Sequence, residues 1–383
     1  MVISVTNPFD IFSPEAHSNH ALYARMRNDD PVHRAIDPRT GDPVWFLTRY
    51  DHCVSFMKDK RFGKETRFRL QANPPEKQAS TSTHETINRH MLNLDEPDHA
   101  RLKSLVHKAF TPSRVAALRP RLQALADGLL EALDNELADG DEFDLTERYA
   151  ESFSLLSIMA MLGIPSADYL QFRTWTKTLL LSRDDITAHT AIIEFSMYLH
   201  RQIDLRHERL ISTDDLLTGL IFAEDGGDRL SRQELLAMVF LLFAAGYETV
   251  TNFISNGVLS LMENPEQRQI LRDNLDNPTI VNSAVEEMLR YKCPSYMTLP
   301  SWAIEDVELG GKVIQKGDIV HAVLDAANRD PAVFAQPNMF DILRHPNKHI
   351  AFSQGIHHCL GAPLARLEGE IAITTLLRWM PEW

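Results

Sequence analysis

The residues most suited to a chemical role lie near the C-terminus, in the run Phe-Ser-Gln-Gly-Ile-His-His-Cys-Leu-Gly at residues 352–361. A helix is predicted over residues 362–377, so Cys359 lies on a loop at the start of a helix. Backbone N–H groups point outward there and the helix dipole favours an anion, which stabilises a thiolate. Gly355 and Gly361 let the backbone pass close to something flat and bulky. In a chain with no Cys-x-x-Cys pair, these features suit haem iron better than zinc.

A lone cysteine is usually a buried core residue, but the joint spacing of Phe, Gly, His, Cys and Gly is rarer, on the order of one chain in 10^4 to 10^5. The stretch resembles the haem-binding loop of the cytochrome P450 family, Phe-Gly-x-Gly-x-His-x-Cys-x-Gly. The resemblance implies that Cys359 is the axial ligand of haem b iron. It also implies that Phe352, His357 and Gly361 bind the cofactor. Ser353 occupies the second position, where glycine is usual, and leaves the ligand in place.

A second signal lies in a long predicted helix that opens with the capping box Ser231-Arg-Gln-Glu234 and runs to about Met262. Residues 235–246 are apolar or small without a break, which is too short to span a bilayer. A helix that is apolar all round belongs in the centre of a large protein. The helix is therefore predicted to cross the core.

The run Ala-Gly-Tyr-Glu-Thr at residues 245–249 interrupts this apolar helix. The Thr249 hydroxyl can bond the Ala245 carbonyl and open the helix there. Taken alone, Glu248 and Thr249 read as a surface acid and an incidental hydroxyl. The run nevertheless matches the family's oxygen-activation motif, Ala/Gly-Gly-x-Asp/Glu-Thr. The resemblance implies that Glu248 and Thr249 relay protons and that Ala245 contacts the haem.

His99 and Lys103 lie four residues apart on a helix predicted to begin at Pro97, so they share one face. From the residues alone, a solvated pair and a functional pair are equally good interpretations. The resemblance implies that both bind haem propionates, with Lys103 replacing the usual Arg and losing its bidentate fork. The family often places another propionate-binding Arg near Ser301, and none is present here.

A Glu-x-x-Arg pair, Glu287 and Arg290, lies on the polar face of a helix predicted to begin at Asn277-Pro278. Most such pairs are solvated surface pairs. The resemblance implies instead a buried pair with Arg344 as the third member. We assign this trio a folding role and no chemical one.

The pattern predicts a mainly α-helical fold with a small β region, and the resemblance implies one P450 domain over residues 1–383, with haem held between the long helix and the Cys359 loop. Residues 61–90 are predicted to form a long loop, which in this family covers the substrate pocket, and residues 169–190 the lid helices. The family usually continues into a further β-hairpin, so either the sequence is incomplete or the pocket floor is built differently. The other predicted elements are helices at 16–28, 51–58, 113–180 (broken near 140 and 163) and 180–210 and a strand at 43–48. A small sheet is predicted over 307–320, with turns at Gly310-Gly311 and Gly317.

The net charge, the cysteine content and the first residues of the chain argue against several classes of protein. The net charge of −14, from 39 basic and 53 acidic residues, argues against a nucleic-acid binder. Three scattered cysteines argue against a disulfide framework and suit a reducing cytoplasm. The first seven residues lack a basic patch followed by an apolar run, so neither a signal peptide nor a membrane anchor is predicted.

The implied reaction is monooxygenation, in which one atom of O2 enters a lipophilic small molecule and the other leaves as water. Electrons would come from a ferredoxin or flavodoxin with its reductase. Phe243, Tyr247 and Met297 suggest an apolar substrate pocket.

The alternatives are a peroxygenase or isomerase on the same fold, which needs the Glu248–Thr249 pair less, and a non-catalytic haem carrier or gas sensor. Zinc binding through adjacent His357, His358 and Cys359 is a remote third, because adjacent ligands do not easily reach one tetrahedral metal.

Overall fold

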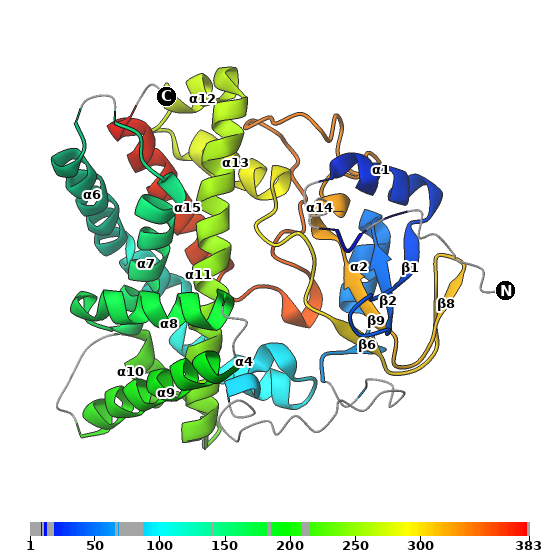
Figure 1. Cartoon of the computed structure of the whole chain (residues 1–383), viewed down its shortest axis with the longest axis horizontal. Coiled ribbons are helices and arrows are strands. Elements are labelled where there is room, and N and C mark those ends of the chain that lie inside the picture. Colours follow the sequence, from blue (N-terminus) through cyan, green and yellow to red (C-terminus); the bar gives the residue numbers. More distant parts are fainter. Residues whose placement is uncertain are drawn as a thin grey trace. The chain divides into compact units, whose positions relative to one another are not determined.

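The computed structural model describes Phe9 and Phe68 together with residues 11–13, 19–65, 87–138, 141–181, 185–208 and 215–380. The chain divides into two compact units, each made of two stretches (Figure 1). Unit 1 combines Met1–Glu76 with Glu286–Cys359, and unit 2 combines Lys77–Val285 with Leu360–Trp383. A mainly helical fold with a small β region is confirmed. The single domain stays a prediction, because a compact unit is not by itself a domain.

Unit 1 is built on a five-stranded sheet with the strand order β1-β2-β9-β6-β3. Only the β2–β9 pair is parallel; the other pairs are antiparallel. The strands are β1 (Val32–Ile36), β2 (Pro43–Leu47), β3 (Phe62–Gly63), β6 (Ser301–Ala303) and β9 (Ile319–Ala322). The sequence pattern missed β1, in which His33 and Arg34 disrupt the apolar run. Of the loop predicted over residues 61–90, residues 66–67 and 69–86 lie outside the described residues.

A hairpin, β7 (Val307–Leu309) and β8 (Lys312–Ile314), accompanies this sheet. Gly310 and Gly311 form its two-residue turn with φ of +58° and +75°, which favours glycine at both positions. The predicted turn is therefore confirmed. Unit 1 also contains α1 (His20–Asp29), α2 (Tyr50–Lys58) and α14 (Leu324–Ala327). The start predicted for the first helix lies outside the described residues.

The Glu-x-x-Arg pair lies on α13 (Pro278–Tyr291). The face of this helix that carries the pair is buried, whereas the sequence pattern placed the pair on a polar face. Glu287 and Arg290 side chains are both 0% exposed and pair at 2.7 Å, and Arg344 Nε reaches Glu287 at 3.1 Å. Arg290 also donates to the carbonyls of Asn328, Pro337 and Met339 at 2.8–3.0 Å. The trio therefore fixes the irregular segment that leads to the Cys359 loop.

Unit 2 is a helical assembly arranged around the long helix α11 (Arg232–Glu263), which contacts α7, α15 and the π-helical turn before α7 (Figure 1). Its other helices are α4 (Asp98–Ala109), α5 (Pro112–Ala117), α6 (Arg119–Glu136), the π-helical turn Thr146–Glu151, α7 (Ser152–Leu162), α8 (Tyr169–Leu181), α9 (Asp185–His207), α10 (Leu216–Ile221), α12 (Pro265–Arg272), the first part of α13 and α15 (Ala362–Trp379). Short elements complete it: the 3-10 turns Met91–Asn93 and Ser166–Asp168 and the hairpin β4 (Glu224–Asp225) and β5 (Asp228–Arg229). The break predicted near residue 163 is confirmed by Gly163 at φ +68°.

The predicted capping box opens α11. Glu234 N–H donates to the Ser231 hydroxyl at 3.3 Å, and Ser231 N–H donates to the Glu234 carboxylate at 2.8 Å. In the described part of the chain, α11 is the helix long and apolar enough to cross a membrane, and more than half of its most apolar stretch is buried inside the protein. Its burial agrees with the predicted core position.

Helices α11 and α15 approach closely at Gly369, where a Cβ atom would lie within 2.5 Å of Cζ of Phe253. We expect Gly369→Ala to lower the free energy of unfolding by roughly 1–3 kcal/mol, because the buried ring has to shift. Gly128 on α6 has nothing within 4 Å of such a Cβ atom, so Gly128→Ala should raise stability by about 0.5–1 kcal/mol. Urea unfolding of both variants measures the difference. A similar stabilisation of both would show that the helices do not touch at Gly369.

Candidate functional site

The loop that carries Cys359 is folded onto itself before it enters α15. Cys359 N–H donates to the Phe352 carbonyl at 2.9 Å, and His358 N–H donates to the Gly355 carbonyl at 3.2 Å. The expectation that the amides here point outward unpaired is therefore wrong for Cys359 itself. Gly361 is the N-cap residue of α15 with φ −76°, a conformation open to any residue.

Two residues of this loop have positive φ. Gly355 has φ +73°, and a Cβ atom there would collide with the Met57 carbonyl oxygen of α2. Its glycine is thus required by a neighbouring backbone in unit 1, which the sequence did not reveal. Ser353 has φ +62°, although it is not glycine, and its hydroxyl lies 3.1 Å from Met57 Sδ. The turn keeps the left-handed conformation that glycine favours and carries its strain.

The three cysteines differ sharply in accessibility. Cys53 and Cys293 are buried, and their thiols donate to the carbonyls of Leu47 and Ser295. Burial raises the pKa of both thiols, so they stay protonated. Cys359 is only half-buried. Of the three, its thiol is the one available to an iron atom, so the donor set fits a single thiolate ligand for haem.

One stripe of α11 is exposed while the rest of its central part is largely buried. Ala245, Glu248 and Thr249 are exposed, with the i, i+3, i+4 spacing of one helix face. Thr249 Oγ1 donates to the Ala245 carbonyl at 2.6 Å, as its position predicted. The α-helix is continuous through this point, so the predicted opening is not present. The exposed stripe brings the three predicted residues together on one surface.

Phe243 and Tyr247 lie on buried faces of α11, so the suggestion that they line a pocket is wrong. The Phe243 ring packs against Phe172 of α8 and Phe195 of α9, with centroids 5.3 and 5.5 Å apart. The Tyr247 hydroxyl donates to the buried Glu151 carboxylate of the π-helical turn. Burial, followed by this bond, raises the pKa of Tyr247. No local sequence pattern predicts this contact between distant segments.

Helix α4 carries His99 and Lys103 on one face and Arg101 and Lys108 on another. Arg101 and Lys108 pair with Asp228 and Asp225 at 3.1 and 2.7 Å. His99 is 3% exposed; burial, and next the nearby Lys103 charge, lower its pKa. At neutral pH His99 is thus a neutral donor, and Lys103 carries the charge of the pair.

Glu368 of α15 is a buried acid that the sequence analysis missed. Its side chain lies among apolar neighbours, and burial raises its pKa to about 8. In the described structure its Oε1 atom has no hydrogen-bond partner. An acid four residues after Leu364, on the same apolar stripe, was the available signal.

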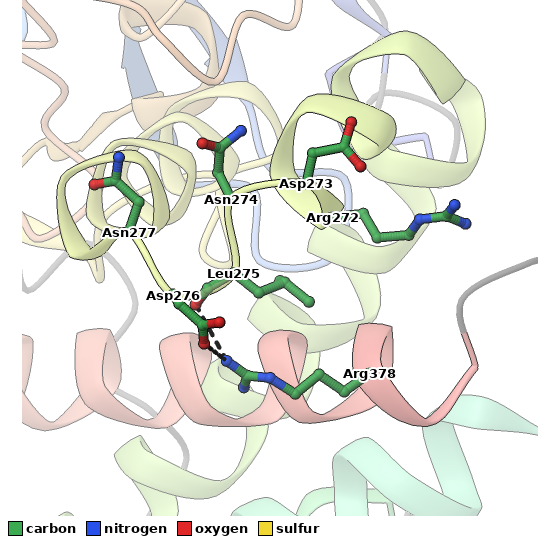
Figure 2. Close-up of a pocket in the computed structure, with 7 residues that line it drawn as sticks. All are labelled: Arg272, Asp273, Asn274, Leu275, Asp276, Asn277 and Arg378. Carbon is green, nitrogen blue, oxygen red and sulfur yellow. Dashed lines mark hydrogen bonds and ion pairs between the residues drawn. The ribbon is translucent and has the colours of Figure 1, made fainter.

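A surface pocket lies where α12 leads into α13, and none of the predicted site residues line it. In Figure 2, Arg378 of α15 reaches toward Asp276, to which it donates at 2.8 Å, and toward the Leu275 carbonyl. The lining is polar and Asp276 is almost fully exposed. Nothing in it suits a lipophilic ligand. Across the described residues, no three His, Cys, Asp or Glu side chains are grouped to hold a metal ion, so the zinc alternative gains no support.

Comparison with known proteins decides the family. The family model described as cytochrome P450 matches residues 154–379. This chain belongs to the cytochrome P450 family. It is 37% identical over 371 residues to the polyketide biosynthesis cytochrome P450 PksS of Bacillus subtilis, covering 96% of this chain and 89% of that protein. It is 41% identical to the cytochrome P450 monooxygenase PikC of Streptomyces venezuelae, covering 95% and 84%.

Solved P450 structures share the fold. The PksS structure matches with a TM-score of 0.86 at 36% identity, covering 97% of this chain and 91% of that one. The myxobacterial cytochrome P450 CYP267B1, solved in complex with myristic acid, matches with a TM-score of 0.85 at 41% identity, with the same coverage. The predicted P450 fold is thus confirmed, and the chain is an oxidoreductase of a haem-thiolate monooxygenase family. Among the described residues, those that fit the haem are Cys359 as ligand, with Phe352 and His357 beside it in the loop.

The strain at Ser353 predicts a stabilising substitution. We expect Ser353→Gly to raise the free energy of unfolding of the holoprotein by about 1 kcal/mol, because glycine adopts the left-handed conformation without steric cost. Ser353→Ala keeps the strain and removes only the contact with Met57, so it should give no gain. Urea unfolding distinguishes the two. A Ser353→Gly protein no more stable than Ser353→Ala would contradict the assigned backbone conformation.

Proposed function

We propose that this P450 inserts one oxygen atom from O2 into a lipophilic small molecule, by hydroxylation or epoxidation, with haem b as cofactor. The observation that carries the proposal is the exposed stripe of Ala245, Glu248 and Thr249 on a helix otherwise largely buried. An exposed acid and hydroxyl on a core helix have no packing role. They suit proton transfer, which the peroxygenase, isomerase and gas-sensing alternatives need less.

When bound, the haem supplies the binding and reductive activation of O2. Cys359 Sγ would hold the iron as a thiolate and push electron density towards it. The Thr249 hydroxyl donates a hydrogen bond to the Ala245 carbonyl. The lone pairs of its oxygen therefore remain able to accept a proton and pass it on. Glu248, one residue earlier and exposed, would renew that proton from solvent. Small Ala245 leaves room beside the hydroxyl.

The haem propionates would be bound by His99, Lys103 and His357. Because the pKa of His99 is lowered, His99 would donate a neutral hydrogen bond, while Lys103 supplies the charge. His357 is half-buried in the turn Gly355–His357, two residues before the thiolate. Glu287, Arg290 and Arg344 would act by folding the segment that carries this loop.

Electrons would come from a separate ferredoxin or flavodoxin with its reductase, as the resemblance to bacterial P450s implies. A lipophilic substrate is supported by the polyketide role in the name of PksS and by the myristic acid bound to CYP267B1. A cytoplasmic enzyme is supported by the lack of a disulfide bond among Cys53, Cys293 and Cys359 and by the burial of α11.

Turnover with isotopically labelled O2 tests this proposal. The purified holoprotein, supplied with a ferredoxin, its reductase and a panel of fatty acids and macrolides, should give a product that carries one labelled oxygen atom. Product labelled from peroxide or water instead of O2 would favour the peroxygenase alternative. Binding of O2 without product across the panel would favour the gas-sensing one.

The proton-relay role of Thr249 predicts uncoupling. Thr249→Ala should bind haem and substrate but yield several-fold less product per electron pair, with the missing equivalents recovered as hydrogen peroxide. Thr251 is a matched control, because its hydroxyl makes the same kind of bond, to the Tyr247 carbonyl at 2.8 Å, but is buried. Thr251→Ala should stay coupled. Equal coupling in both variants and the parent would remove Thr249 from the relay.

A further inference from the structure

Strand β6 begins at Ser301, the position near which the family resemblance implies a cation for a haem propionate. Ser301 is 4% exposed, and the other residues of β6 are Trp302 and Ala303. The strand therefore offers no positive charge of its own. Any cation at this end of the sheet has to come from a neighbouring strand.

Lys64 lies beside this position. β3 pairs antiparallel with β6 through Gly63↔Trp302, the last pair of this ladder, and Lys64 and Ser301 are the next residues of the two chains beyond that pair. Directly opposed residues of antiparallel strands have Cβ atoms about 4.5–5.5 Å apart. A long side chain at position 64 thus reaches the same region as one at position 301.

The hydrogen bonds of Lys64 locate its charge. Its Nζ atom donates to the carbonyls of Leu299 at 2.8 Å and Pro300 at 3.1 Å, so the ammonium group lies against the chain immediately before Ser301. The Lys64 charge also acts on a residue of β9. Burial lowers the pKa of His321, a bond to the Thr298 carbonyl opposes this, and the Lys64 charge lowers it further.

We propose that Lys64 binds a haem propionate and supplies, from the adjacent strand, the cation that Ser301 lacks. The inference rests on the proposed function, because it requires haem bound through Cys359. The ammonium group would form a charge-assisted hydrogen bond with the carboxylate, as a point charge and without the bidentate fork of Arg. Lys64, Ser301 and Cys359 all belong to unit 1.

Haem transfer from the holoprotein to apomyoglobin tests the proposal. Lys64→Met should release haem about tenfold faster than the parent, the effect of losing one charge-assisted bond. Lys64→Arg should release it at the parent rate. Lys316→Met, which removes an exposed lysine from the same unit, should also match the parent. Adding Ser301→Arg to Lys64→Met should restore slow release, because the cation returns on β6.

Three results would overturn the proposal: release at the parent rate in Lys64→Met, equally fast release in Lys64→Arg, or a Lys64→Met apoprotein with a lowered urea midpoint, which would assign the loss to strand pairing. The Lys64→Arg comparison decides the matter even where Ser301→Arg does not fold. The carbon monoxide difference spectrum of the parent distinguishes failure of the proposed function from failure of the role of Lys64. A parent without thiolate-ligated haem would refute the proposed function, whereas a normal parent with unchanged Lys64→Met would refute only the role of Lys64.

Discussion

The ligand loop depends on one ion-pair cluster, formed by the fully buried side chains of Glu287 and Arg290 and by the Arg344 side chain, which is 9% exposed. The segment before the loop has almost no regular structure, so its backbone groups need partners from elsewhere. Arg290 and Arg344 bind five of its carbonyls, and Glu287 accepts from Asp341 N–H and Asn347. Removing Glu287 would leave the buried Arg290 charge without its carboxylate partner, which costs roughly 3–5 kcal/mol. The loop that carries the proposed thiolate ligand is thus fixed by charged residues for which we propose no chemical role.

Helix α11 carries its packing contacts and the residues of the proposed proton relay on different faces. Phe243 and Tyr247 anchor it to α8, α9 and the π-helical turn, and Phe253 packs against Gly369 of α15. These contacts hold the helix straight and continuous although Thr249 bonds back to the Ala245 carbonyl. The exposed stripe can therefore carry an acid and a hydroxyl without loss of core packing. A rigid element of this kind positions proton-transfer groups better than a loop.

The sequence predicted those features of the fold that depend on residues close together along the chain. The capping box of α11, the Gly310–Gly311 turn and the Thr249 back-bond depend on residues within four positions of one another, and all are present. Long-range contacts were missed. Helical periodicity cannot show which apolar face meets which neighbour, so Phe243 was assigned to a pocket and Tyr247 was not paired with Glu151. The collision that requires Gly355 involves α2, nearly 300 residues away in sequence, and no local pattern encodes it. The family resemblance identified the buried trio, which the local pattern placed on a polar face.

The central claim is that Cys359, alone among the three cysteines, ligates haem iron as a thiolate. The carbon monoxide difference spectrum of the reduced holoprotein measures this directly, because the absorption maximum depends on the axial ligand. The account predicts the thiolate-type band in the parent and in Cys53→Ala and Cys293→Ala, whose thiols are buried and bonded to carbonyls. It predicts loss of that band in Cys359→Ser. A Cys359→Ser protein that keeps the band, or a parent that never shows it, would contradict the account.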